Sequence, residues 1–174
     1  MTNIIGQSFG RIKRWMNKNH PKGLSSLNGP ATKSELARLK KYFPDSPESY
    51  LKFLSKHNGE HIAEHTDDCI LPYGSQFYSI SYLIDEWKQL SNIFKENEIT
   101  NLPTKSYLSA SWFHPRWISI AGDQIDPGSN ILYFIDLEPG GGGCVGQIIY
   151  RSEDETKQLA KSFADDVPLR NAQC

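Results

Sequence analysis

The sequence has few cysteines and no pairing pattern among them. Its 174 residues include three cysteines, Cys69, Cys144 and Cys174, and no CxxC motif. An odd number of widely spaced cysteines argues against a disulfide framework and favours a reducing compartment. We therefore expect free thiols and a cytoplasmic location.

Long apolar stretches are also missing. No run approaches the roughly 20 apolar residues that a membrane-spanning helix needs. The N-terminus does not combine a charged start with a long apolar stretch, which argues against a secretory signal. A chain of this length can bury about two thirds of its unfolded surface. We therefore expect a single domain, residues 1–174, that folds without metal or disulfides.

Net charge is close to zero, but the two signs are separated along the chain. Residues 1–41 contain nine lysines and arginines and one acid, a charge of +8, whereas residues 42–174 carry −9. A separation of this kind concerns binding partners more than fold. The acidic body could complement a basic protein, or it could be a solvated surface with no partner.

The N-terminal part, residues 1–30, is a basic amphipathic helix followed by a turn-rich loop. This pattern can lie on an anionic membrane surface. We favour a helix whose apolar stripe packs on the domain, because no lipidation motif accompanies it. The apolar positions are Ile4, Ile5, Phe9, Ile12, Trp15 and Met16, and the basic ones are Arg11, Lys13, Arg14 and Lys18.

The remaining core, residues 32–165, starts with helices. Thr32 and Glu35 fit a capping box, and Pro44 ends the helix that follows. Ser46 is the expected cap of the next helix, which ends at Asn58-Gly59. Two short strands are expected at 69–71 and 77–80. The strongest helical pattern comes next, with Leu83, Ile84, Trp87, Leu90, Ile93 and Phe94 along one face.

Strands gather in the second half of the chain. The candidates are 117–121, 131–137 and 147–150, separated by turn residues, and a last helix is expected from 153 to about 164. Helices come first and strands later, without regular alternation, which predicts an α+β fold. We expect the stretch 112–150 to supply the central sheet.

The sharpest enzyme-like motif is HxxEH, formed by His61, Glu64 and His65. On a helix, both histidines would share a face and could bind zinc, with Glu64 as general base and His57 extending the row. The motif follows a helix stop, however, and has only two apolar residues within it. We therefore favour an exposed polar loop and expect no metal site and no catalytic residues.

The run 141–146 satisfies GxGxxG and follows an apolar strand. A dinucleotide site needs a helix next, whereas the residues that follow predict a strand. We interpret the glycines as a flexible connection between strands and expect no cofactor. Cys144 has no assignable histidine and acid, so we interpret it as a small residue at a strand start.

Two further groups have structural interpretations. Asp67 and Asp68, with Glu60 and Glu64 nearby, could chelate a cation, but a solvated acidic loop is the better interpretation. We expect four aromatics in the core and no nucleic-acid binding, because Arg116 is the only basic residue near them. These aromatics are Trp112, Phe113, Trp117 and Tyr133.

A signature runs through the second half of the chain, in the segments 111–120, 122–123, 130–131, 135–139 and 146–149. Taken together, these segments resemble the SUKH superfamily, and more narrowly its Smi/Knr-type group of fungal cell-wall-assembly regulators and bacterial relatives. The upstream segment 47–59 is similar to the family's Pro-x-x-Tyr-x-x-Phe-Leu…Asn-Gly stretch. Asp123 and Asp136 stand where strands meet turns and can bond backbone N–H groups there. The signature residues, for which we expect structural roles, are Trp112, Trp117, Gly122, Asp123, Asp136, Pro139, Gly146 and Gln147.

The resemblance implies an α+β fold with a mixed, largely antiparallel sheet flanked by helices, and no catalytic machinery. It also implies binding of other proteins. Bacterial members resemble immunity proteins that neutralise toxins by binding them, and fungal members resemble regulatory hubs with long disordered flanks. The sequence shows no such flanks, so we expect the compact bacterial type.

The leading hypothesis is a non-enzymatic, cytoplasmic immunity protein that binds and neutralises a cognate bacterial toxin, such as a basic nuclease. The alternatives are an intracellular regulator or scaffold of cell-wall synthesis and, less favoured, a zinc-dependent hydrolase using the HxxEH motif. The expected contacts with a partner are the loop acids Glu60, Glu64, Asp67 and Asp68.

Overall fold

The computed structural model describes residues 4–61, 69–96, 105–110, 112–123 and 131–163. Its helices are α1 (Ile4–Asn19), α2 (Pro21–Ser25), α3 (Lys33–Tyr42), α4 (Glu48–Leu54) and α5 (Ile80–Glu96), with a short 3-10 helix, η2 (Pro72–Gly74). Its strands are β1 (Ser75–Phe77), β2 (Trp117–Asp123), β3 (Leu132–Asp136), β4 (Gln147–Arg151) and β5 (Thr156–Ala160).

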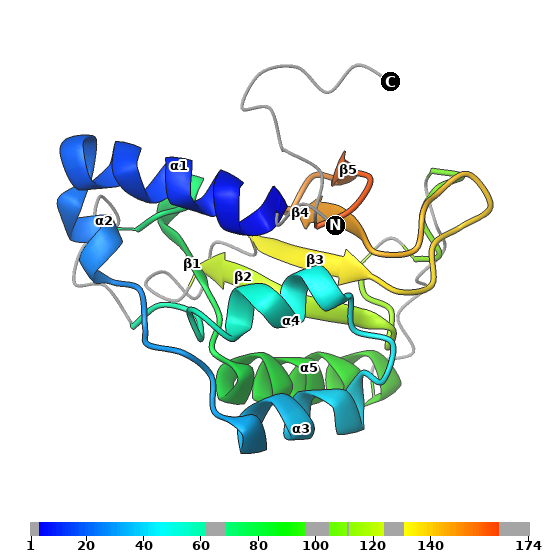
Figure 1. Cartoon of the computed structure of the whole chain (residues 1–174). Coiled ribbons are helices and arrows are strands. Elements are labelled where there is room, and N and C mark those ends of the chain that lie inside the picture. The colour runs from blue at the N-terminus through cyan, green and yellow to red at the C-terminus, as the bar shows by residue number, and fades with distance from the viewer. Residues whose placement is uncertain (1–3, 62–68, 97–104, 111, 124–130, 164–174) are drawn as a thin grey trace.

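The five strands form one sheet in the order β1-β2-β3-β4-β5, and each neighbouring pair is antiparallel. The predicted α+β class is thereby confirmed. The register shifts between Ser119 and Ala121 in β2, which moves the residues after the shift to the opposite face. Figure 1 shows the sheet with α1 above it and α5 below it.

Helices cover both faces of the sheet. Phe77 in β1 and Tyr133 in β3 share one face, since both pair with Ala121. Phe53 of α4 packs on that face, with its ring centroid 5.2 Å from that of Phe77. Gly122 points to the opposite face, where the Tyr78 hydroxyl lies against it, just ahead of α5. Covered on both faces, the sheet is the middle layer of the domain.

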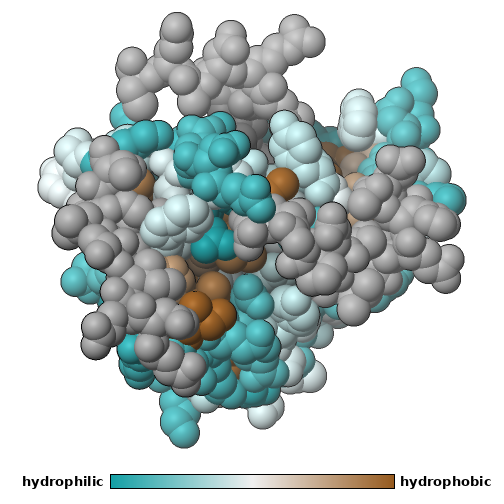
Figure 2. Space-filling view, turned by 180° about the vertical axis from the view of Figure 1, so that it is seen from behind, coloured by the Kyte–Doolittle hydropathy of each residue, from teal (hydrophilic) through white to brown (hydrophobic). Residues whose placement is uncertain are grey.

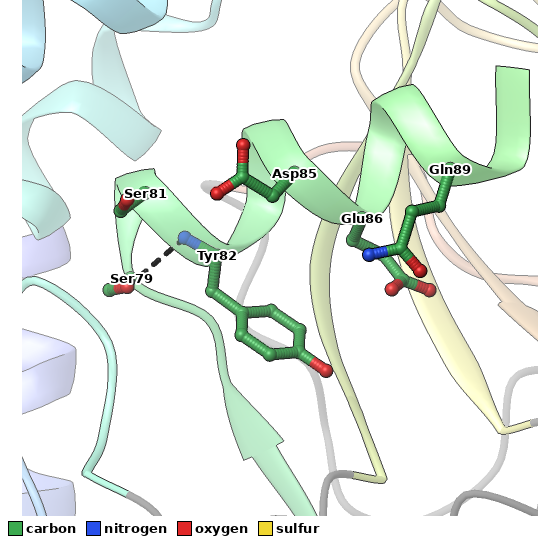
Figure 3. A pocket seen from close by; sticks show the side chains of 6 residues that line it. All are labelled: Ser79, Ser81, Tyr82, Asp85, Glu86 and Gln89. Atoms are coloured by element: carbon green, nitrogen blue, oxygen red, sulfur yellow. Dashed lines mark hydrogen bonds between the residues drawn. The ribbon is translucent and has the colours of Figure 1, made fainter.

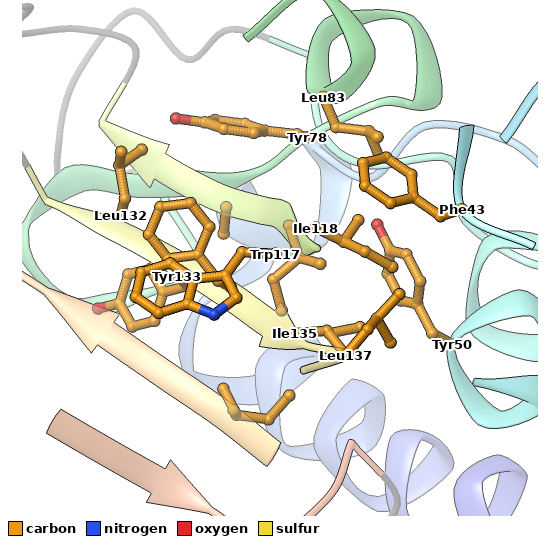
Figure 4. Packing of buried hydrophobic residues seen from close by; sticks show 14 of the residues in the cluster. Phe43, Tyr50, Tyr78, Leu83, Trp117, Ile118, Leu132, Tyr133, Ile135 and Leu137 are labelled. Carbon is orange, nitrogen blue, oxygen red and sulfur yellow. The ribbon is translucent and has the colours of Figure 1, made fainter. Parts of the chain in front are cut away.

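The core gathers around the two central strands. All of β3 is buried, as expected for a strand with neighbours on both faces. Figure 4 shows Tyr50 of α4 and Leu83 of α5, with Phe43 at the C-cap of α3, grouped with Ile118 and other sheet residues in this cluster. Burial of these side chains supplies the main stabilisation of the fold.

The expected capping box is present at the start of α3. Thr32 Oγ1 accepts a hydrogen bond from the Glu35 N–H at 3.2 Å, and Glu35 Oε2 accepts one from the Thr32 N–H at 2.7 Å. The cap expected at Ser46 is wrong. Pro47 occupies the N-cap of α4, and Ser46 Oγ donates instead to the Phe43 carbonyl at 2.7 Å, closing the turn after α3.

The last helix that we expected is a strand. Ser152 N–H donates to the Glu155 carbonyl at 2.9 Å, which closes a turn and brings Thr156 opposite Arg151. The apolar spacing of Leu159 and Phe163 suits a helix, but backbone pairing with β4 prevails, because it satisfies one edge of that strand. Residue 164, the expected end of the helix, lies outside the described residues.

Two of the short strands were also misplaced. Residues 69–71 are not a strand, and the strand expected at 77–80 is β1, which ends at Phe77. The chain then turns into α5, whose first N–H, that of Ile80, donates to Asn58 Oδ1 at 2.9 Å. A side chain distant in sequence therefore determines where this helix begins.

We predict that Gly122→Ala destabilises the protein, by about 1–3 kcal/mol, because overpacking forces neighbours to move. An added Cβ would lie 2.2 Å from the Tyr78 hydroxyl and 2.8 Å from the Ile131 carbonyl oxygen. Gly141→Ala is the matched control, since a Cβ there meets no atom within 4 Å. Urea unfolding of both variants measures the difference; equal midpoints would contradict the close approach.

Candidate functional site

The HxxEH motif does not begin on a helix. His61 is exposed and lies outside any helix or strand, with its N–H donating to the Ser26 carbonyl at 2.9 Å and its carbonyl accepting from Gln76 Nε2 at 2.8 Å. Glu64 and His65 lie outside the described residues. Among the residues that the structure describes, no three His, Cys, Asp or Glu side chains gather as a metal site.

His57 faces α1 instead of the HxxEH motif. Its ring centroid is 5.2 Å from that of Phe9, its Nδ1 is 3.2 Å from the Asn28 carbonyl oxygen, and its Nε2 is 3.4 Å from Lys13 Nζ. Burial lowers its pKa, and the nearby lysines act in the same direction. The side chain thus helps to hold the N-terminal helix.

Glu60, expected as an exposed partner contact, is buried with 4% of its surface exposed. Its carboxylate accepts hydrogen bonds from Ser26 Oγ and from the Phe77 N–H, both at 2.7 Å. Burial raises its pKa, while these hydrogen bonds oppose the rise. Glu60 therefore ties the loop after α2 to β1. The other expected contacts, Glu64, Asp67 and Asp68, lie outside the described residues.

We predict that Glu60→Ala lowers the free energy of unfolding by about 1–3 kcal/mol, because it leaves a buried N–H and a buried hydroxyl without their acceptor. Glu48→Ala is the control. Its side chain is 72% exposed and makes only an i,i+4 ion pair with Lys52, so its loss should change stability by less than about 0.5 kcal/mol. Chemical denaturation tests both; an unaffected Glu60→Ala would disprove the structural role.

The glycine run connects β3 to β4, and β4 follows it as expected. The run is not loose, however. The N–H groups of Gly140 and Gly142 donate to the carbonyls of Tyr107 and Ser106, each at 3.2 Å. Gly146 adopts φ +86°, which favours glycine, at the entry to β4. Cys144 is an exposed free thiol in this connection.

The signature residues Asp136 and Gln147 form a buried pair across β3 and β4. Gln147 Nε2 donates to Asp136 Oδ2 and to the Tyr107 carbonyl, both at 2.9 Å. Asp136 Oδ1 accepts from the Glu138 N–H at 2.9 Å, the turn bond that we expected. The pair therefore joins the two strands to the segment that holds the glycines.

The other signature residues divide between core and surface. Trp117 and Gly122 are buried, and Pro139 and Asp123 are half-buried, the latter at the end of β2. Trp112 is 38% exposed, so the expectation of a core aromatic is wrong there. It lies beneath Arg151 instead, whose guanidinium carbon is 5.7 Å from the indole centroid.

An open pocket along α5 is the candidate functional site. We call it the α5 surface. It is lined by Ser79, Ser81, Tyr82, Asp85, Glu86 and Gln89. In Figure 3, Tyr82, Glu86 and Gln89 project from one side of the helix, and the Tyr82 N–H donates to Ser79 Oγ at 3.3 Å. The helical repeat brings these side chains together.

Aromatic and charged groups meet at this surface. Tyr82 is 37% exposed, and its ring centroid is 4.5 Å from that of Tyr78. Burial raises the pKa of Glu86, an effect that the positive charge of Arg151 opposes. Arg151 also lies over Trp112, so one guanidinium acts on Glu86 and covers that indole.

A family model described as SMI1 / KNR4 family (SUKH-1) matches residues 30–166. The chain belongs to this family. No curated protein matches the chain. The matched span of this SUKH-1 member runs from just before α3 through β5 and includes the whole α5 surface. Membership supports a protein-binding module as its general class of function.

The composition of the α5 surface suits such a role in the SUKH-1 chain. Tyrosine, tryptophan and arginine dominate the binding energy of many protein interfaces. Asp85 and Glu86 add negative charge for a basic partner. Figure 2 shows the face seen from behind as mostly hydrophilic, with hydrophobic side chains in small separate areas. Scattered apolar groups of that kind are ordinary on a protein surface.

Sequence patterns missed this surface. Tyr82, Asp85 and Glu86 stand at i, i+3 and i+4, a spacing that puts them on one side of a helix, and that was the available signal. Nothing in the spacing indicated that Arg151 of β4 would act on Glu86 and cover Trp112. Within the described residues, no helix has the length and apolar character to cross a membrane.

We predict that Glu86 makes stability fall as pH rises. Because burial raises its pKa in the folded state, folding favours the protonated form. Wild type should therefore lose stability relative to Glu86→Gln as pH rises from about 4 through the folded pKa. In Glu35, hydrogen bonds from Thr32 lower the pKa, so wild type should gain stability relative to Glu35→Gln as pH rises from its lowered folded pKa to about 4, an interval below that of Glu86. Urea unfolding against pH would refute the assignment if both pairs showed the same sign.

Proposed function

We propose that this SUKH-1 protein is an immunity protein that binds and neutralises a cognate bacterial toxin. The family match over residues 30–166 carries the proposal. In this proposal the protein acts by binding the toxin, and it catalyses no reaction of its own. We also propose that it works in the cytoplasm, where a reducing environment suits the exposed thiol of Cys144.

The α5 surface is the proposed contact with the toxin. Tyr82 and Trp112 supply exposed aromatic area that is already ordered, since each packs on a neighbouring side chain. A side chain held in place before binding loses little entropy on binding, which favours affinity. Asp85 is held by Lys88 at 3.2 Å and by Arg38 at 3.9 Å, so its carboxylate is also positioned.

Charge favours a basic toxin, such as a nuclease. Residues 42–174 carry a net −9, and they include the acids of the α5 surface. Opposite charge on the toxin would raise the association rate through electrostatic steering. The loop acids Glu64, Asp67 and Asp68 remain proposed as a second set of contacts.

The test starts from the adjacent reading frame: if its product arrests growth as a toxin would, that product is co-expressed with this protein. Wild type should restore growth, and Tyr82→Ala and Trp112→Ala should weaken protection. With a catalytically inactive toxin, calorimetry should show Kd rising at least about tenfold for each variant, the loss expected of an interface anchor. Trp15→Ala is the control, because Trp15 is an exposed aromatic on α1, across the sheet from α5.

The outcomes distinguish a failure of the immunity proposal from a wrong choice of contact surface. Growth arrest that wild type does not relieve would end the immunity proposal. Protection that survives both aromatic substitutions, but not the combined change of Glu64, Asp67 and Asp68 to alanine, would move the contact from α5 to the loop.

A further inference from the structure

The helix α1 has an exposed flank as well as a buried one. On the buried flank, Phe9 packs edge-on against Phe53 with ring centroids 5.3 Å apart, and Met16 is 3% exposed. The expected packing of an apolar stripe on the domain is therefore present. On the other flank, Ile12 and Trp15 remain 47% and 62% exposed. Packing on the domain does not account for these two side chains.

Basic residues surround the exposed pair. Arg11, Trp15 and Lys18 stand at i, i+4 and i+7, so they form one row along the helix. Ile12 and Arg14 flank this row, and all five side chains are exposed. We call Arg11, Ile12, Arg14, Trp15 and Lys18 the α1 patch. It combines a large aromatic with three positive charges and has no acid within it.

The charge separation in the chain is only in part a separation in space, because α3, which carries four of the nine basic residues of segment 1–41, packs beside α5. The α1 patch belongs to the segment that carries +8, whereas residues 42–174 carry −9. Figure 1 places α1 and α5 on opposite sides of the sheet. On its side of the sheet, α1 itself carries four basic residues and no acid, so a negatively charged surface would attract this helix.

We propose that the α1 patch docks this protein reversibly on an anionic phospholipid membrane surface. A row of positive charges along the outside of a helix complements the diffuse negative charge of a lipid surface. Tryptophan prefers the headgroup level, where its ring is buried and its N–H stays hydrated. Ile12 would enter beside Trp15, while lysine and arginine contact phosphates.

An acidic protein is the competing occupant, and the patch suits it less. Protein hot spots are side chains enclosed in well-packed pockets. Trp15 is instead the most exposed of the described tryptophans and stands on the outside of the helix, which suits shallow insertion. The contact lies outside the family match, which begins at residue 30, and is independent of toxin binding.

The experiment is co-sedimentation of the full chain with vesicles of phosphatidylcholine alone and of phosphatidylcholine mixed with phosphatidylserine. We expect wild type to sediment with the mixed vesicles only, and less so as salt rises. Trp15→Ala and the double variant Arg11→Glu with Lys18→Glu should each weaken binding at least tenfold. Urea unfolding of each variant checks that the substitutions leave the fold intact.

Lys52→Glu is the matched charge control, because Lys52 is an exposed lysine on α4 with a 60% exposed side chain. It should bind mixed vesicles almost as wild type does, and so should Tyr82→Ala. Equal binding to both vesicle types, or an equal loss in Lys52→Glu and in the Arg11/Lys18 variant, would overturn the proposal. Binding to polyglutamate but not to mixed vesicles would also overturn it and favour an acidic protein. None of these outcomes would affect the proposal of toxin neutralisation, which is tested separately by co-expression.

Discussion

The fold depends on the hydrogen bonds of one short segment, Asn58 to His61, which joins the N-terminal helices to the sheet. Asn58 Oδ1 accepts from the first N–H of α5 and its Nδ2 donates to Glu35 Oε1 at 2.9 Å, so one amide connects α3 with α5. Two residues later, the Glu60 N–H donates to the Phe77 carbonyl at 2.8 Å, while the Glu60 carboxylate accepts from the Phe77 N–H. Gly59 adopts φ +73° between them, and a Cβ there would lie 2.4 Å from the Ser79 backbone nitrogen. Only glycine allows this approach, because the two backbones are already in contact.

These bonds have consequences for both proposed surfaces. They determine where α5 begins, and with it the direction in which Tyr82 and Glu86 leave the helix. On the other side of the sheet, α4 ends shortly before the same segment, and its Phe53 supports Phe9 of α1. An aromatic and acidic surface therefore lies on one side and a basic helix on the other. A toxin and a membrane could be bound at the same time, because the two contacts share no residue.

Local patterns predicted much of the fold and little of the candidate site. The capping box of Thr32, the turn bond of Asp136 and the strands β2 to β4 follow from interactions within a few residues, and each is present. The prediction of a last helix was wrong. The apolar spacing of this segment suited a helix, but backbone pairing with β4 makes it a strand. Trp112 was expected in the core together with three other aromatics, but it is exposed and lies against Arg151, almost forty positions away. Contacts of that separation leave no periodic signal.

By itself, the sequence determined the α+β class, the family, the separation of charge and the amphipathic character of α1. These properties depend on composition and on spacing within one helix or strand, where the physical rules act locally. Only the tertiary structure decided which acids are buried, which aromatics are exposed and which elements form one surface. Glu60 is the clearest case: in the sequence it is one acid of a polar loop, and in the fold its carboxylate accepts bonds from Ser26 and Phe77. A polar group can be buried without a large energetic cost only where hydrogen-bond partners are present. The partners of the Glu60 carboxylate come from distant parts of the chain.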